Sequence, residues 1–125
     1  VVGNASELKN ALLFNRAEVP HFNYVGDSIL GFKAHLGAGV KISNLKITPG
    51  HVSLEHDGRL IDTGLRKFGA LLGDHANVGC NAVLNPGTLL GPRSLVTPTL
   101  SFGGVLPANM IAHARPQIKF IPRRD

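Results

Sequence analysis

The sequence predicts an all-β domain, a left-handed parallel β-helix built from hexapeptide repeats. The main observation is that aliphatic residues recur every six positions, at Leu72, Val78, Leu84, Leu90 and Val96. Glycine follows most of them, and a small residue stands four positions after most of them. Composition agrees, because 15 glycines and 8 prolines among 125 residues favour many turns over a helical bundle.

In this fold each unit of six residues forms one short strand and one corner, and three units complete a triangular coil. The aliphatic residue points inward, so that successive coils stack their apolar side chains into columns. We expect the small residue at the fifth position, such as Ala76 or Ala82, to face the interior near a corner. Glycine or asparagine at a corner would relieve the steric cost of a positive φ. A sandwich of short strands is the competing interpretation, but its turns recur about every 8–12 residues.

The same spacing extends toward the N-terminus in two groups of three residues, Leu13, Val19 and Val25, then Leu30, Leu36 and Ile42. Between the two groups the phase slips by one residue. Asp27 and Asp74 each follow a glycine at a predicted corner, and we expect their carboxylates to accept hydrogen bonds from nearby backbone N–H groups.

The repeat fails between about residues 45 and 68. Asp57-Gly58 stands there between two short alternating segments, which predicts a β-hairpin extruded from one corner of the helix. Long ordered loops of this kind are often functional. The repeat resumes near Ala70 and fades after Gly103-Gly104.

Residues 1–125 are therefore expected to form a single domain, with a non-repeat C-terminal tail over about 103–125. The chain begins without methionine and inside a repeat-like pattern, which suggests a part of a longer protein. Its one cysteine, Cys80, excludes an internal disulfide and fits a cytoplasmic protein.

The formal net charge of +5 suggests a site for small phosphates. The cations are scattered and no base-reading motif is present, so we expect no nucleic-acid partner. No segment reaches the roughly 18 apolar residues that span a membrane, so we expect no membrane partner either.

Four segments carry a resemblance to a known family: Glu7-x-Lys9, His21-x-x-Tyr24-x-Gly26-Asp27, Gly37-Ala38-Gly39 with Ser43-Asn44, and Lys67-Phe68 before Leu72-Gly73-Asp74. They resemble the acetyltransferase domain of the bifunctional N-acetylglucosamine-1-phosphate uridyltransferases and glucosamine-1-phosphate acetyltransferases, which are hexapeptide-repeat acyltransferases. The insertion between Asn44 and Lys67 is more similar to archaeal sugar-1-phosphate nucleotidylyltransferases that carry an acetyltransferase domain.

The resemblance implies an acetyl-CoA-dependent N-acetyltransferase that acts on an amino-sugar 1-phosphate, in the biosynthesis of UDP-N-acetylglucosamine or a related nucleotide sugar. By this resemblance His21 would be the general base, for which the ordinary histidine pKa of about 6.5 is suitable. Asn44 would contact the amino sugar near the reacting group. Lys9, Tyr24 and Lys67 would hold the sugar phosphate through charge and hydrogen bonds.

The remaining site residues are also implied by the resemblance. His35 stands where the family has an asparagine that seats the sugar or acetyl group. Ala38, Cys80 and Pro98 would line the coenzyme A groove, and Arg115 would meet a phosphate of the coenzyme. The family forms homotrimers with active sites between subunits, and a trimer would repeat the site three times.

Some residues depart from the family and leave a second function open. Besides His35, Cys80 replaces a serine and Pro98 replaces an alanine, and proline has no backbone N–H to donate. The alternative is a non-catalytic trimerisation or regulatory β-helix domain of a sugar-1-phosphate nucleotidylyltransferase. The six histidines lack the spacing of the zinc-binding hexapeptide carbonic anhydrases, so no metal site is predicted.

Overall fold

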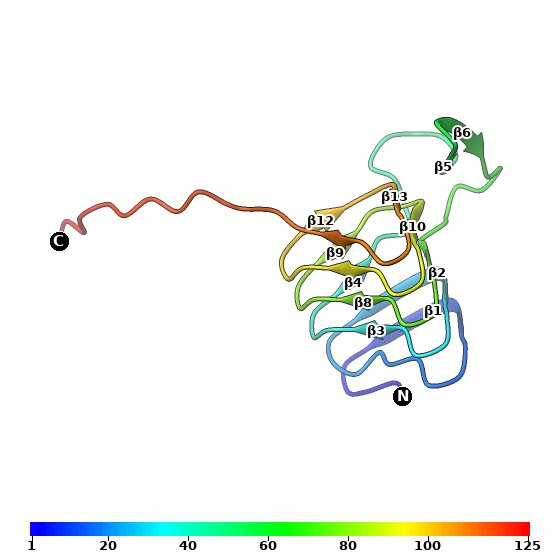
Figure 1. The fold of residues 1–125 in the computed structure, drawn as a ribbon, viewed down its shortest axis with the longest axis horizontal. Coiled ribbons are helices and arrows are strands. Elements are labelled where there is room, and N and C mark those ends of the chain that lie inside the picture. Colours follow the sequence, from blue (N-terminus) through cyan, green and yellow to red (C-terminus); the bar gives the residue numbers. More distant parts are fainter.

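The computed structural model describes all 125 residues and confirms the left-handed parallel β-helix, which stacks about six coils (Figure 1). It contains strands and turns but no helix. The strands are β1 (Glu7–Leu13), β2 (Tyr24–Leu30), β3 (His35–Leu36), β4 (Lys41–Ile42), β5 (Ser53–His56), β6 (Arg59–Asp62), β7 (Ala70–Leu72), β8 (Asn77–Val78), β9 (Val83–Leu84), β10 (Thr88–Leu90), β11 (Leu95–Val96), β12 (Ser101–Phe102), β13 (Val105–Leu106) and β14 (Ile111–Ala112).

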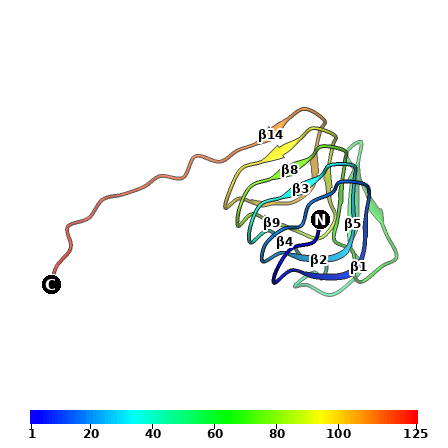
Figure 2. The same cartoon turned by 90° about the horizontal axis from the view of Figure 1, so that it is seen from below.

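Parallel strands form the three faces of a triangular prism, which is seen from below in Figure 2. The first face contains β3, β8, β11 and β14. The second contains β4, β9 and β12 with the N-terminal halves of β1 and β2, and the third contains β7, β10 and β13 with their C-terminal halves. Because β1 and β2 run around the corner between the second and third faces, these two faces form one hydrogen-bonded sheet.

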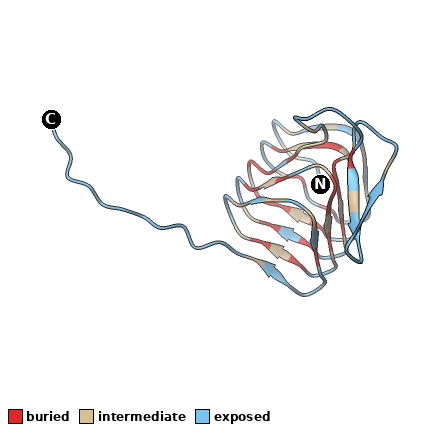
Figure 3. Ribbon diagram, turned by 90° about the horizontal axis from the view of Figure 1, so that it is seen from above, coloured by how far each residue is buried: buried red, intermediate tan, exposed pale blue.

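The predicted columns of aliphatic side chains fill the interior, where buried residues line the prism (Figure 3). On the first face Val19, Leu36, Val78 and Val96 have no solvent exposure. A single coil would leave such a side chain exposed to water along the axis of the prism. Its burial therefore depends on the two neighbouring coils that cover it from above and below. The small residues of the fifth position also face inward, as Ala76 shows with 0% exposure.

The phase slip of the sequence is a feature of one corner. In the two N-terminal coils, the inward residues of the second and third faces are five positions apart instead of six. These pairs are Leu8 with Leu13 and Val25 with Leu30. The missing residue tightens the corner that joins the second and third faces. One residue in each coil adopts a left-handed conformation there, Asn10 and Asp27 with φ values of 54° and 47°.

The glycines of the second position have another role than the sequence suggested. The left-handed conformation falls at the fourth position of the unit, as at Lys33, His75 and Arg93 with φ values of 55°, 60° and 59°. Glycine or asparagine does stand at this corner position in other units, as Gly39 and Asn81 show with φ values of 76° and 58°, so the expectation for such residues at corners is confirmed there. The glycines of the second position do not have a positive φ. These glycines admit the neighbouring coil instead: a Cβ on Gly73 would lie 2.6 Å from the backbone nitrogen of Pro92.

The hairpin is confirmed. Strands β5 and β6 pair in antiparallel fashion from Ser53 with Asp62 to His56 with Arg59. The two turn residues, Asp57 and Gly58, have φ values of 48° and 75°, as a two-residue hairpin turn requires. The hairpin projects from the prism (Figure 1), while β4 pairs directly with β9, so that the coils close beneath it.

The coils extend further toward the C-terminus than the sequence pattern predicted, which weakened after Gly103-Gly104. Strand β13 pairs with β10, and β14 pairs with β11, so the coils continue to Ala112. The expected start of the tail near residue 103 was wrong because one unit, from Phe102 to Leu106, is shortened and still keeps the register, and the next unit to Ala112 has its full length again. Beyond Ala112 the chain is extended and exposed, leading away from the prism (Figure 3).

We expect Gly73→Ala to lower the free energy of unfolding by about 2 kcal/mol, because its methyl group would force two coils apart. Gly103→Ala is the matched control, since a Cβ at Gly103 would find its nearest neighbour at 3.4 Å. Urea denaturation of both variants measures the difference. Equal stability of the two would contradict the role assigned to Gly73.

Candidate functional site

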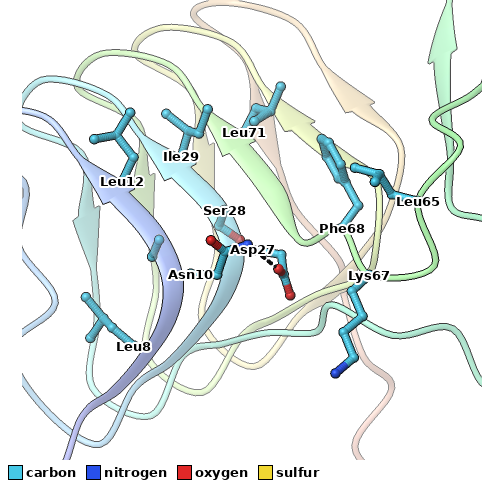
Figure 4. Close-up of a pocket in the computed structure, with 11 residues that line it drawn as sticks. Leu8, Asn10, Leu12, Asp27, Ser28, Ile29, Leu65, Lys67, Phe68 and Leu71 are labelled. Carbon is cyan, nitrogen blue, oxygen red and sulfur yellow. Dashed lines mark hydrogen bonds between the residues drawn. The ribbon is translucent and has the colours of Figure 1, made fainter.

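A carboxylate organises the tight corner between the second and third faces. Oδ1 of Asp27 accepts a hydrogen bond of 2.7 Å from the side-chain amide of Asn10 (Figure 4). Oδ2 accepts one of 2.6 Å from the amide of Asn44, which comes from the coil above. We call Asn10, Tyr24, Asp27 and Asn44, together with Lys9 and Lys67, the Asp27 cluster.

Tyr24 joins this cluster through Asn44, whose Nδ2 also donates to the tyrosine hydroxyl at 3.2 Å. The contact is possible because Gly26 lies beneath it. A Cβ on Gly26 would come within 2.7 Å of the Tyr24 hydroxyl and closer still to the Asn44 amide. The glycine therefore keeps room for the two polar side chains.

Two lysines flank the carboxylate. Lys9 is aligned with Gly26 in the register of β1 and β2, and Lys67 forms an antiparallel bridge with Leu45 at the neck of the insertion. The hydrogen bond from Asn10 lowers the pKa of Asp27 most, burial opposes this, and Asn44, Lys67 and Lys9 lower the pKa further. The corner thus combines a charged carboxylate with two cations, a setting suited to an anionic, hydroxyl-rich ligand.

A cavity of about 560 Å³ opens at this corner, which is within the range of small-molecule sites. Asn10, Asp27 and Lys67 form its polar side, while aliphatic side chains of the third face form its apolar side (Figure 4). Phe68 lines it at the end of the insertion.

A second group of predicted site residues lies at the corner between the first and second faces. Backbone hydrogen bonds stack His21, Ala38, Cys80 and Pro98 in successive coils: Gly39 N donates to His21 O, Asn81 N to Ala38 O, and Thr99 N to Cys80 O. We call these four residues the His21 column. Part of it borders a cavity of about 480 Å³ that Ala38, Cys80 and Lys41 line.

The backbone of His21 is fixed while its imidazole is free. Asn23 is 3% exposed and accepts a hydrogen bond of 3.1 Å from the backbone N–H of His21. The Asn23 amide in turn donates to Gly37 O at 2.8 Å. The imidazole is exposed and forms no hydrogen bond or ion pair, so its nitrogens can meet a ligand. Tyr24 follows His21 by three positions, so their Cα atoms lie within about 11 Å.

The structure brings the predicted Lys9, Tyr24, Asn44 and Lys67 together, but it places other predicted residues elsewhere. His35 lies on the outer side of the first face, where its Nδ1 is 3.4 Å from Glu18 Oε1. Arg115 lies in the exposed tail and contacts neither group.

Sequence reasoning missed the central role of Asp27. Its carboxylate was expected to bind backbone N–H groups, but it accepts side-chain amides, because the tight corner turns it outward toward Asn10 and Asn44. The Gly-Asp step of the resemblance motif was the available signal. For Asp74 the expectation was right, since its Oδ1 accepts the backbone N–H of Phe32 at 2.8 Å.

Two wider features of the structure bear on its partners. No group of three or more His, Cys, Asp or Glu side chains is arranged to hold a metal ion. None of its elements is a helix of the length and apolar character that crossing a membrane requires.

Comparison with known sequences gives several archaeal bifunctional relatives. The chain is 33% identical over 78% of its length to a bifunctional sugar-1-phosphate nucleotidylyltransferase/acetyltransferase of Sulfurisphaera tokodaii. It is 36% identical over 76% of its length to the bifunctional protein GlmU of Methanococcus vannielii. The chain spans about a quarter of these relatives, 24% and 23% of their lengths. No family model matches the chain.

Solved structures support the fold. Serine acetyltransferase 1 of Entamoeba histolytica, solved with L-cysteine, superposes on 84% of this chain and 37% of its own with a TM-score of 0.60 and 13% identity. A perosamine N-acetyltransferase mutant of Caulobacter crescentus, solved with CoA and GDP-perosamine, covers 90% of this chain and 47% of its own with a TM-score of 0.51 and 17% identity.

Replacing Asp27 by asparagine should destabilise the protein at neutral pH and leave it unchanged in acid. The pKa of Asp27 is below its ordinary 3.8 in the folded protein, so the charged carboxylate contributes stability above about pH 4. That contribution is lost as the pH falls through the lowered pKa. Because the group is largely solvated, we expect a difference below about 1 kcal/mol at pH 7. Urea denaturation between about pH 2.5 and pH 7 measures it; a difference that stayed constant over this range would contradict the assignment.

Proposed function

The chain is a hexapeptide-repeat domain homologous to the bifunctional sugar-1-phosphate nucleotidylyltransferase/acetyltransferases, and from this premise we propose that it is an acetyl-CoA-dependent N-acetyltransferase acting on an amino-sugar 1-phosphate. The observation that carries the proposal is the Asp27 cluster, in which four predicted site residues, Lys9, Tyr24, Asn44 and Lys67, gather at one corner. The reaction would belong to nucleotide-sugar biosynthesis in the cytoplasm.

His21 is the proposed general base. The amine nitrogen of the sugar attacks the carbonyl carbon of the acetyl thioester while the imidazole accepts the amine proton. A C–N bond forms, the C–S bond breaks, and the thiolate leaves with a proton to become the thiol of coenzyme A. The exposed imidazole without hydrogen bonds and the anchored backbone of His21 support this role.

The Asp27 cluster is the proposed site for the sugar phosphate. Lys9 and Lys67 supply the two cations for the phosphate group. Asn44 directs its N–H groups at Asp27 and Tyr24, so its carbonyl oxygen remains able to accept a hydrogen bond from the sugar. Asp27 in this proposal positions Asn44 and is not itself a reacting group.

Coenzyme A is proposed to lie along the His21 column, where Ala38, Cys80 and Pro98 present one residue per coil. Arg115 would meet a phosphate of the coenzyme from the tail. His35, on the outer side of the first face, would influence which sugar is accepted.

A homotrimer is part of the proposal, and the outer side of the third face supports it. Five coils each place one outward residue in the same register on this face, and all five residues are aliphatic: Leu12, Ile29, Leu71, Leu89 and Val105. The outward rows of the other two faces include charged and polar residues such as Glu18 and Lys41. An aliphatic row of this length favours contact with another chain over contact with water.

The second candidate is a trimerisation or regulatory domain without catalysis. Pro98 favours it, because this residue of the His21 column has no N–H to donate to a coenzyme. In that case the aliphatic third face would still assemble chains.

We expect thiol release from acetyl-CoA in the presence of glucosamine 1-phosphate or galactosamine 1-phosphate. His21→Ala should lower turnover by at least about a hundredfold, because it removes the base. His56→Ala, at the tip of the hairpin, is the control and should keep full activity. Absence of turnover with either sugar in a folded, assembled protein would refute the transferase proposal and leave the non-catalytic domain.

Light scattering at micromolar concentration should give three times the chain mass of 13.3 kDa. Leu71→Glu should yield single chains, because it places a charge in the middle of the aliphatic row. Leu95→Glu, in the outward row of the first face, should leave the assembly intact. A monomer mass for the unaltered protein would refute the trimer.

A further inference from the structure

The neck of the insertion places two cations opposite one another. Leu45 and Lys67 form an antiparallel bridge there, and the next positions toward the hairpin are Lys46 and Arg66. Both line one cavity of about 540 Å³, together with His51. Like charges opposite each other across paired strands are destabilising, so this arrangement needs an explanation.

No carboxylate forms an ion pair with either cation. Neither Lys46 nor Arg66 takes part in an ion pair, and the half-buried Lys46 directs its Nζ to the backbone oxygen of His51 at 3.3 Å. Asp62 acts on Lys46 only electrostatically, because its oxygens are engaged by Gly64 N at 2.7 Å and by His51 Nδ1 at 3.1 Å. The neck therefore brings two cations without ion pairs to one cavity, a setting suited to a bound anion.

This cavity is distinct from the one at the Asp27 cluster. Successive residues of an extended strand point to opposite sides. Accordingly Arg66 lines the neck cavity, while Lys67 lines the cavity that contains Asp27. Two separate cationic positions thus lie on either side of this segment of the neck.

We propose that the neck binds the pyrophosphate group of a small phosphorylated metabolite, held between Lys46 and Arg66. The guanidinium fork and the ammonium come from opposite stems and can each form charge-assisted hydrogen bonds with one phosphate. Thr48 adds a hydroxyl to the lining. The side chain of Ile47, at 104% exposure, stands at the rim and offers an apolar surface to the organic part of such a molecule. This inference goes beyond acetyl transfer and stands without it.

Calorimetric titration of the full chain with inorganic pyrophosphate tests the site. We expect saturable binding that weakens as salt is raised, and about tenfold weaker binding in Lys46→Gln and in Arg66→Gln. Arg59→Gln, a cation of the hairpin strand β6 outside the cavity, is the matched control and should bind like the unaltered protein. Lys67→Gln should also bind pyrophosphate normally, although it should impair any turnover of a sugar phosphate. ADP, which carries the same group, should compete.

Arg66→Glu separates binding from folding. This variant replaces the repulsion at the neck by an attraction to Lys46, so its denaturation midpoint should rise while pyrophosphate binding disappears. Unchanged binding in Arg66→Glu, equal loss in Arg59→Gln, or no binding by the unaltered protein at millimolar pyrophosphate would overturn the proposal. If the unaltered protein binds pyrophosphate but shows no acetyl transfer, only the proposed transferase function is refuted.

Discussion

The in-register stacking of one coil on the next is the constraint from which the rest of this structure follows. Leu36 is buried because Val78 lies above it and Val19 lies below it, and neither neighbour is close in sequence. The columns fix the register, the register fixes which residue stands at each corner, and the corners carry the candidate functional groups. A change in the number of residues between two columns therefore relocates a corner side chain.

The tight corner illustrates this dependence. One residue fewer in each of the two N-terminal coils turns Asn10 and Asp27 into left-handed conformations, and the shortened turn directs their side chains toward each other. The insertion leaves the prism two coils from the N-terminus at the same corner, between Asn44 and Lys67. The short corner and the insertion thus both contribute to the Asp27 cluster. The short corner supplies the carboxylate of Asp27, and the end of the insertion places Lys67 near it.

Much of this was visible in the sequence. The six-residue period predicted the inward columns, and Asp57-Gly58 predicted the hairpin, because both signals depend on residues close together in the chain. The tail start near residue 103 was misjudged, since one shortened unit, from Phe102 to Leu106, interrupts the period without breaking the register of the coils. The hydrogen-bond partners of Asp27 were also misjudged. A corner carboxylate can accept a backbone N–H of its own corner or a side-chain amide from the next coil. Which of the two it accepts depends on how the coils stack at the shortened corner, and this is not encoded in the pattern of residues along the chain.

The separation of the two site groups argues for assembly as a condition of any chemistry. The second face lies between the His21 column and the Asp27 cluster, and its outer side is open to solvent at Tyr24 and Lys41 in the single chain. A thioester exchange needs its reacting atoms about 3–3.5 Å apart and shielded from water. One chain supplies the groups along an open face but no wall opposite them. The aliphatic third face borders the Asp27 corner, so a second chain docked there would supply that wall with the same contact that buries the aliphatic row.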